Sequence, residues 1–356
     1  MTAASRIDSV ADATAIADEL ARLGVPDERV QRWQLARDPY RPEVTVETDA
    51  AGTLQAAALT TARPATAATK IVDLWWRGED AGQRVLAELI AAARSRGDVA
   101  LKWEVPAGAE LPAFAAAAGF VAMRRPWAAV GTEAVQGFVL WLQPGPMREF
   151  GYYAQTTLFT CGAVAALIAA EDAAAGGFDG GAGDRDLELE FWRGASNYPA
   201  CEPVGLAVAL RDRIGGTPIE VHLDLDGPAL LEGYTGFEHD FRALLQQESH
   251  RQAAERGIPV HRERVEIAEV IRRVVAGERA LLLIDEAPMH GDAGPHWVIA
   301  HSVVGGAAVI EDPWVNVETG ETWVDSHALP VAHEDLDRLV RWGEDGYRGV
   351  VFVGGV

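Results

Sequence analysis

Apolar positions in the second half of the chain recur with two periods, one typical of helices and one typical of strands. Apolar residues three and four apart predict helices at residues 161–172, 187–192, 204–213, 237–256, 268–276 and 333–342. Short β-branched runs predict strands at residues 219–225, 260–265, 280–285, 296–304, 307–311 and 350–353. We therefore expect an α+β fold in which helices cover a largely antiparallel sheet.

The first half of the chain has a different order of elements. Helical spacing predicts helices at residues 11–23, 83–96 and 111–118, and strand-like runs occupy residues 44–48, 53–61, 68–76 and 99–105. The first three of these strands fit an antiparallel meander. A segment rich in Pro and Gly, 143–146, separates the two halves, and 356 residues exceed one typical domain. We expect two domains, residues 1–145 and 146–356.

Cys161 stands at the start of an apolar, alanine-rich helix. The first turn of a helix offers partial positive charge and unpaired backbone N–H groups, which favour a thiolate over a thiol. Gln155 precedes the cysteine by six residues, and its amide could donate to an oxyanion formed beside the sulfur. This short stretch therefore predicts both a nucleophile and an oxyanion donor.

The best candidate base is His296, which opens a predicted strand far downstream. A Gly305-Gly306 turn leads into the next strand, and Asp312 follows that strand. Antiparallel pairing of the two strands would bring the histidine and the carboxylate together. A carboxylate in that place orients the imidazole and stabilises its charged form. Cys161, His296 and Asp312 thus fit the roles of nucleophile, base and orienter.

Each of these residues also has a structural explanation. A lone cysteine before an apolar helix is more often a buried hydrophobe than a nucleophile, and Asp312 before Pro313 is a common way to open a turn. His301 is the other candidate for the base. It lies an odd number of positions after His296 on the same predicted strand, so its side chain should point to the opposite face of the sheet. His290 lies in a predicted loop, where we expect a solvated side chain.

The second cysteine, Cys201, also precedes an apolar helical run, but Ala195 stands where Cys161 has its glutamine. The adjacent Glu202 would oppose thiolate formation, so we expect Cys201 to be structural. Two cysteines without a secretory segment do not predict a disulfide framework, and the sequence is typical of the reducing cytoplasm.

The pattern Gln-x5-Cys-Gly at a helix start, then His-Trp-Val on a strand, then Asp-Pro resembles the double-glycine leader peptidases. These are papain-like cysteine proteases that process bacteriocin precursors. The resemblance covers residues 148–356 and implies a papain-like fold, with Cys161 as nucleophile, His296 as general base, Asp312 as orienter and Gln155 in the oxyanion hole. Thr160 departs from the pattern, because the family often has Asp there.

The order of elements in the first 140 residues resembles a GNAT acetyltransferase domain of α/β type. In that family a loop at a helix N-terminus binds the pyrophosphate of acetyl-CoA through backbone N–H groups. Aligned here, Arg77 and Gly82 take the first and last places, and Asp80 replaces the middle glycine. A carboxylate repels pyrophosphate and its side chain blocks close approach. We therefore expect a degenerate domain used for binding or support, and no cofactor.

The composition limits the classes of molecule that the protein is expected to bind. A formal net charge of −22 argues against nucleic acid and against anionic membrane surfaces. No apolar run approaches the roughly 20 residues that span a bilayer, so we expect a cytoplasmic protein that does not bind membranes. Metal ligands spaced as Cys-x2-Cys or His-Glu-x2-His do not occur, and we predict no metal site.

The sequence therefore predicts a cysteine peptidase or amide hydrolase acting on a peptide or small amide. Three alternatives remain open. The first domain could be an active acetyltransferase fused to the peptidase, which would require acetyl-CoA to bind despite Asp80. An amine acceptor would turn the same triad into an acyltransferase or amide-forming enzyme. Alternatively, both domains could be retired enzymes that bind a peptide without catalysis.

Overall fold

The computed structural model describes residues 6–10, 12–127, 134–171, 177–195 and 199–354. These residues divide into two compact units. The first comprises the described residues within Met1–Met123, Glu133–Pro144 and Asn316–Asp325, and the second comprises those within Arg124–Thr132, Gly145–Val315 and Ser326–Val356. The α+β architecture expected from the sequence is confirmed in both units.

The first unit is built on one seven-stranded sheet with strand order β1-β2-β3-β4-β5-β7-β6. Its strands are β1 (Arg6–Val10), β2 (Glu43–Thr48), β3 (Leu54–Thr61), β4 (Ala68–Trp76), β5 (Ala100–Pro106), β6 (Val121–Ala122) and β7 (Val135–Trp141). Neighbouring strands are antiparallel except β4 and β5, which are parallel. The predicted meander is confirmed as β2-β3-β4, and β1 adds a strand that the sequence analysis missed.

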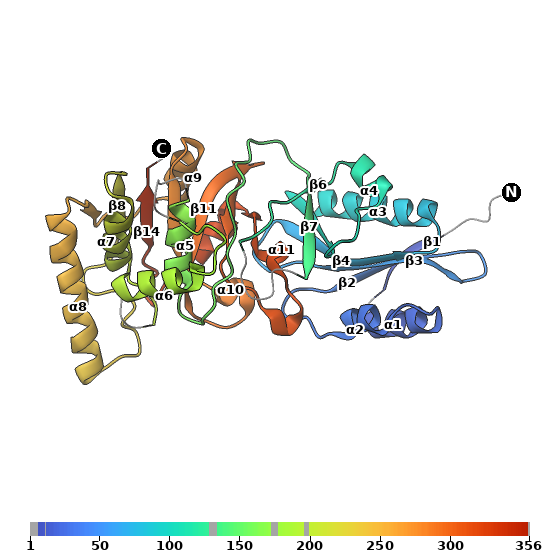
Figure 1. Ribbon diagram of the computed structural model, residues 1–356, viewed down its shortest axis with the longest axis horizontal. Coiled ribbons are helices and arrows are strands. Elements are labelled where there is room, and N and C mark those ends of the chain that lie inside the picture. Colours follow the sequence, from blue (N-terminus) through green and yellow to red (C-terminus); the bar gives the residue numbers. More distant parts are fainter. Residues whose placement is uncertain (1–5, 11, 128–133, 172–176, 196–198, 355–356) are drawn as a thin grey trace. The chain divides into compact units, whose positions relative to one another are not determined.

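Helices cover both faces of this sheet (Figure 1). They are α1 (Ala13–Arg22), α2 (Asp27–Gln34), α3 (Glu79–Arg96) and α4 (Ala113–Ala118). Strand β3 shows why both faces are covered. Its Ala56 and Ala58 pack with α3, whereas Ala57 and Leu59 pack with α1 and α2. In a strand buried on both faces, apolar residues follow one another instead of alternating with polar ones, as Ala56–Leu59 do here.

The segment Asn316–Asp325, which follows β12 in the chain, completes the first unit. It carries a short 3-10 turn (Val317–Thr319) and the start of α11 (Trp323–Ser326). Buried Lys70 lies 2.8 Å from Glu104 and also forms an ion pair with Asp325. Breaking a buried ion pair of this kind typically costs about 3–5 kcal/mol, so the segment is firmly anchored.

The second unit contains another seven-stranded sheet, with strand order β13-β12-β11-β10-β14-β8-β9. Its strands are β8 (Ile219–Leu223), β9 (Val260–His261), β10 (Arg279–Asp285), β11 (Pro295–Val304), β12 (Ala307–Glu311), β13 (Leu329–Val331) and β14 (Gly349–Val353). All neighbours are antiparallel except β8 and β9. The strand predicted at 260–265 is wrong in length, because its pairing ends at His261.

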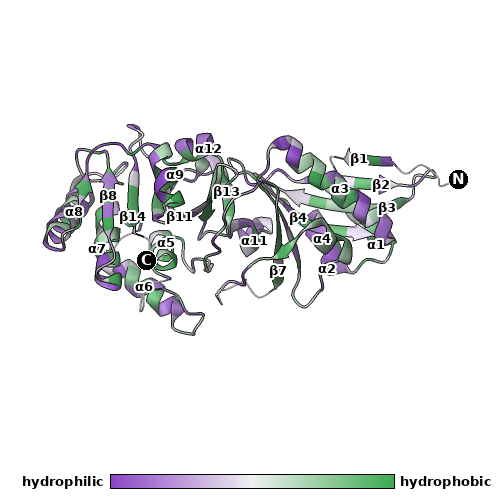
Figure 2. Cartoon of the chain, turned by 90° about the horizontal axis from the view of Figure 1, so that it is seen from above, coloured by the Kyte–Doolittle hydropathy of each residue, from purple (hydrophilic) through white to green (hydrophobic). Residues whose placement is uncertain are grey.

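Helices of the second unit are α5 (Cys161–Ala169), α6 (Asp184–Ala195), α7 (Pro203–Ile214), α8 (Gly236–Glu255), α9 (Ile267–Val275), α10 (Ala287–His290) and α12 (His333–Leu339). Every residue of α5 is buried, and its ribbon is coloured hydrophobic in Figure 2. This helix packs on β10 and β11 and shares one core with α7 and β14 (Figure 1). A helix that is apolar all round requires such a central position.

Among the described residues, no helix combines the length and the hydropathy that crossing a membrane would require.

Candidate active site

Cys161 is the first residue of α5 and is 4% exposed. The next position, Gly162, explains the Cys-Gly pair physically. A Cβ atom there would lie 3.0 Å from the Trp297 ring and 3.1 Å from Cys201 Cβ, which is tighter than ordinary contact. Glycine thus lets the start of α5 approach β11 closely and brings Cys161 near the strand that carries His296.

His296 lies near the start of β11, and Asp312 directly follows β12. The two strands pair antiparallel as expected, with a bulge between Ala300 and Ser302. His296 Nε2 lies 2.7 Å from Asp312 Oδ1, and both side chains are buried. Since Nε2 is occupied in this way, Nδ1 is the ring nitrogen left for Cys161, which lies close enough to raise the pKa of His296. The structure therefore brings three of the predicted residues together.

Electrostatics at His296 favour its charged form. Burial alone would lower the pKa of His296, but attraction to Asp312 and the contact with Cys161 raise this pKa well above its usual value. Asp312 Oδ1 also accepts a hydrogen bond of 2.8 Å from the Trp314 backbone N–H. The aspartate therefore opens a turn and orients the histidine at once, so the two interpretations of Asp312 are compatible.

Gln155 lies in the loop that leads to Cys161. Its Nε2 donates to the Thr157 carbonyl at 2.8 Å, and its backbone N–H donates to the Pro313 carbonyl at 2.9 Å. The second bond ties the glutamine to the residue after Asp312. An amide nitrogen has two hydrogens, so one remains for another acceptor.

Glu188 of α6 is a functional candidate that the sequence analysis missed. Its buried carboxylate accepts hydrogen bonds of 2.8 Å from both the backbone N–H and the hydroxyl of Thr156, and it also accepts the Thr160 hydroxyl. Thr160 is the N-cap residue of α5. One carboxylate thus fixes both ends of the loop before Cys161. No short motif links the two segments, which are about 30 residues apart, so only the fold reveals this role.

The expectation that His290 is solvated is wrong. Its side chain is 6% exposed, and its Nε2 lies 3.4 Å from Asp312 Oδ2. Helix α10, which the sequence analysis took for a loop, folds the residue back toward β12. Glu286 at the start of α10 is also close. Burial raises the pKa of Glu286, attraction to His296 lowers it, and repulsion from Asp312 raises it again.

His301 hydrogen-bonds a different carboxylate from His296. Its Nε2 lies 2.9 Å from Glu311 Oε1, and His327 Nδ1 lies 2.6 Å from Glu311 Oε2. All three side chains are fully buried. His301 therefore belongs to a separate buried network next to Asp312 in the chain, and His296 remains the histidine beside Cys161.

Cys201 is fully buried. Burial and the proximity of Cys161 and Glu202 raise the pKa of the Cys201 thiol well above its usual value. Its carbonyl accepts a hydrogen bond of 2.9 Å from the Trp297 indole N–H. These contacts fit the structural role expected for this cysteine.

In the first unit, the predicted Arg77–Gly82 loop lies mostly inside α3, which begins at Glu79 and carries Glu79 and Asp80 in its first turn. Two carboxylates at a helix N-terminus disfavour a bound anion. A Cβ atom at Gly82 would lie 3.0 Å from the rings of Trp76 and Phe114, so packing alone accounts for this glycine.

A cavity of about 670 Å³ lies in the first unit beside the ends of β4 and β5. Among its lining residues, Arg29 donates to Asp73 at 2.9 Å, and Arg32 forms an ion pair with Glu104. Each of these two arginines is thus paired with a carboxylate. The cavity lining does not include the candidate catalytic residues.

A model of the Peptidase_C39 like family matches residues 150–354. The comparison with curated proteins found no match. Solved structures that match include the ribosomal-protein-S18-alanine N-acetyltransferase from Escherichia coli, with 17% identity, 44% of this chain and 100% of that chain covered, and a TM-score of 0.30. An IAA acetyltransferase from Bacillus cereus matches with 14% identity, 39% and 99% coverage and a TM-score of 0.30. A GNAT-family acetyltransferase from Staphylococcus aureus matches with 9% identity, 39% and 100% coverage and a TM-score of 0.29.

Proposed function

Because the chain belongs to the Peptidase_C39 like family, we propose that its second half is a cysteine peptidase or amide hydrolase that works by acyl transfer to Cys161. One observation carries the proposal. His296 Nε2 lies 2.7 Å from the Asp312 carboxylate, and Cys161 is near enough to raise the pKa of His296. This is the relationship that an activated cysteine nucleophile requires. A core cysteine needs neither partner.

The raised pKa of His296 favours an imidazolium at neutral pH, the form that can protonate a leaving group. In the proposed reaction, the sulfur attacks the substrate carbonyl carbon and forms a new C–S bond. His296 then gives its proton to the leaving amine as the C–N bond breaks. Water next attacks the thioester carbon while His296 takes a proton from that water, and the C–S bond then breaks to release the carboxylic acid and free Cys161. Asp312 keeps the ring oriented in both steps.

The oxyanion of each tetrahedral intermediate would be stabilised by the Gln155 side-chain amide and the Cys161 backbone N–H. The Cys161 N–H belongs to the first turn of α5, where backbone N–H groups are left without helical acceptors. Fixed donors of this kind contribute more than solvent because they need no reorganisation during the reaction. Glu188 supports the arrangement by holding the loop through Thr156 and Thr160.

The proposed substrate is a peptide or a small amide. Leu158, three residues before the nucleophile, is 82% exposed and offers an apolar surface for a substrate side chain. The order of Gln155, Cys161, His296 and Asp312 further supports a papain-like peptidase similar to the double-glycine leader peptidases.

An activated acyl ester, p-nitrophenyl acetate, tests the chemistry without knowledge of the natural substrate. We expect one acetyl group on Cys161, detected by mass spectrometry of the intact protein and its peptides. Cys161→Ala should abolish the label, and Cys201→Ala, which removes the buried thiol, should retain it. Failure to acylate Cys161 would favour a retired enzyme that binds peptides.

The fate of the acyl group separates hydrolysis from transfer. Release of acetate in buffer alone supports a hydrolase. A label that persists in water but is removed by an added primary amine would instead identify an amide-forming enzyme with the same triad.

A further inference from the structure

Strands β8 and β9 form the edge of the second unit's sheet that is farthest from β12 and β13. They pair in parallel, with His222 directly opposite His261. Glu220 lies two residues before His222, so both side chains point to the same face of β8. The register of two strands thus gathers an acid and two histidines.

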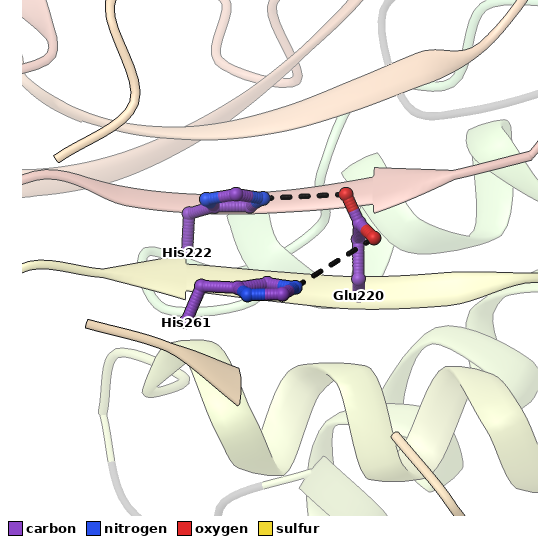
Figure 3. Close-up of side chains that lie close together, drawn as sticks. All are labelled: Glu220, His222 and His261. Carbon is purple, nitrogen blue, oxygen red and sulfur yellow. Dashed lines mark hydrogen bonds and ion pairs between the residues drawn. The ribbon is translucent and has the colours of Figure 1, made fainter. Parts of the chain in front are cut away.

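The three side chains converge on one point (Figure 3). The two imidazole rings are stacked, with centroids 4.5 Å apart and planes inclined by 25°. His222 Nε2 lies 3.2 Å from Glu220 Oε1, and His261 Nε2 lies 3.8 Å from Glu220 Oε2. One ligand atom from each residue lies within 4.8 Å of the others.

We infer that Glu220, His222 and His261 bind one divalent transition-metal ion of the Zn²⁺ class. Two imidazole nitrogens and a carboxylate oxygen are a ligand set that Zn²⁺ commonly takes. Bond lengths of about 2.0–2.2 Å require the donors of a tetrahedral site to be about 3.4 Å apart. The separations from the Glu220 oxygens, 3.2 Å to His222 Nε2 and 3.8 Å to His261 Nε2, lie on either side of this value.

The surroundings suit metal binding. The site is open to solvent, since the exposed fractions of the side chains are 18% for His222, 28% for Glu220 and 41% for His261. Water can therefore fill a fourth coordination position.

Arg273 of α9 is the main positive charge that competes with a metal ion for the Glu220 carboxylate. It forms an ion pair with Glu220 Oε1 and another with Glu278, and its guanidinium carbon lies 3.7 Å from the Phe352 ring centroid. Glu220 Oε2 faces His261 and remains available for the ion. Arg273 would then hold the carboxylate from outside the coordination sphere, as groups hydrogen-bonded to metal ligands commonly do.

A metal at this position would fasten the two-residue strand β9 to β8. The site is distinct from the candidate active site, because β10 and β14 separate β8 from β11. Sequence motifs could not reveal it, since its ligands come from two strands with helix α8 between them. The absence of a metal motif in the sequence is thus compatible with this site.

The test measures binding of Zn²⁺ by titration calorimetry and of Co²⁺ by visible absorption. Both use the full-length Cys161→Ser protein, in which the sulfur of the candidate nucleophile cannot bind the metal. We expect one ion per chain and Co²⁺ ligand-field bands. His261→Ala and Glu220→Gln should each weaken binding at least about tenfold, and Zn²⁺ should raise the melting temperature of the parent but not of these variants.

His239→Ala is the matched control, because this exposed histidine of α8 also has a carboxylate neighbour, Asp240. It should bind as tightly as the parent. Circular dichroism without metal checks that each variant folds, and the exposure of His261 makes its replacement well tolerated. No binding by the parent, or equal binding by the parent, His261→Ala and Glu220→Gln, would overturn the inference.

Discussion

His296 Nε2 lies 2.7 Å from Asp312 Oδ1, although the two residues are 16 positions apart in the chain. The β11–β12 hairpin makes this contact possible by placing one residue near the start of the first strand and the other just after the second. The bond leaves His296 Nδ1 for Cys161. The proposed chemistry therefore depends on the register of this hairpin as much as on the identity of the residues.

Replacement of Asp312 by Asn tests the orienting role. In Asp312→Asn the new side-chain amide would keep an oxygen for the Trp314 N–H but lose the negative charge that raises the pKa of His296. We expect acylation of Cys161 to slow about 100-fold at pH 7, the lower end of what a positioned general base contributes. Stopped-flow release of p-nitrophenol measures the rate. Asp292→Asn, in an exposed loop, is the control, and equal rates in the two variants would remove Asp312 from the mechanism.

Gln155→Ala separates the oxyanion role from the activation of the thiol. Acylation of Cys161 passes through an oxyanion, whereas alkylation by iodoacetamide does not. We expect acylation to slow about 10²–10³-fold, as with loss of one oxyanion donor, and alkylation to keep its rate. If acylation and alkylation of Cys161 both slowed to the same extent, Gln155 would act through the fold of its loop instead.

Glu188→Gln tests the support of the nucleophile loop. An amide cannot accept at both positions that the carboxylate uses for Thr156 and Thr160. Hydrogen bonds to charged groups contribute about 1.5–3 kcal/mol, so we expect the free energy of unfolding to fall by about 2–3 kcal/mol. Urea unfolding measures this, together with slower acylation of Cys161. Glu190→Gln, exposed on the same helix, should leave both unchanged.

A stability difference of less than about 0.5 kcal/mol between Glu188→Gln and Glu190→Gln would contradict the anchoring role, since surface substitutions typically stay within that range. Normal stability with slow acylation would assign Glu188 to the reaction rather than to the loop.

Glu311→Gln tests the buried network with His301 and His327. Burial raises the pKa of Glu311, but its contacts with His327 and His301 outweigh burial and lower the pKa to about 2, against 4.5 for a free side chain. A lowered carboxyl pKa contributes stability above about pH 4.5, and this contribution is lost as the pH falls toward 2.

We expect Glu311→Gln to lose about 3–5 kcal/mol of unfolding free energy at pH 7, since it breaks a buried charged network. The difference from the wild type should shrink as the pH falls from 5 to 3. Guanidinium unfolding at several pH values measures it. A difference that is independent of pH would mean that Glu311 contributes by packing alone.

Local sequence patterns predicted much of the fold. The strands at Ala68–Trp76 and Ala307–Glu311 were predicted to the residue, because strong apolar runs between clear turn signals leave little ambiguity. Strand β1 and helix α2 were missed. Helix α2 is mainly polar and exposes half of its residues, with Val30 and Trp33 buried, so its pattern is weak. Its place depends on packing against the sheet, which no local pattern contains.

The candidate site was predictable where its residues form a motif and not where they meet through the fold. Cys161, His296 and Asp312 could be found from a helix start and a hairpin. Glu188 and His290 could not, because one approaches from α6 and the other through a short helix that begins with Ala287-Pro288. Side chains that support a site from other elements carry no spacing signal.

The most direct test of the central claim is alkylation of the native protein by iodoacetamide between pH 5 and 9, read at each cysteine by mass spectrometry, for wild type and His296→Ala. We predict modification of Cys161 well below the pH at which a free thiol reacts, and its loss in His296→Ala. Cys201 should stay unmodified, because it is fully buried and its pKa is raised. Equal or negligible reactivity of both cysteines, or an unchanged Cys161 profile in His296→Ala, would contradict an activated Cys161–His296 pair.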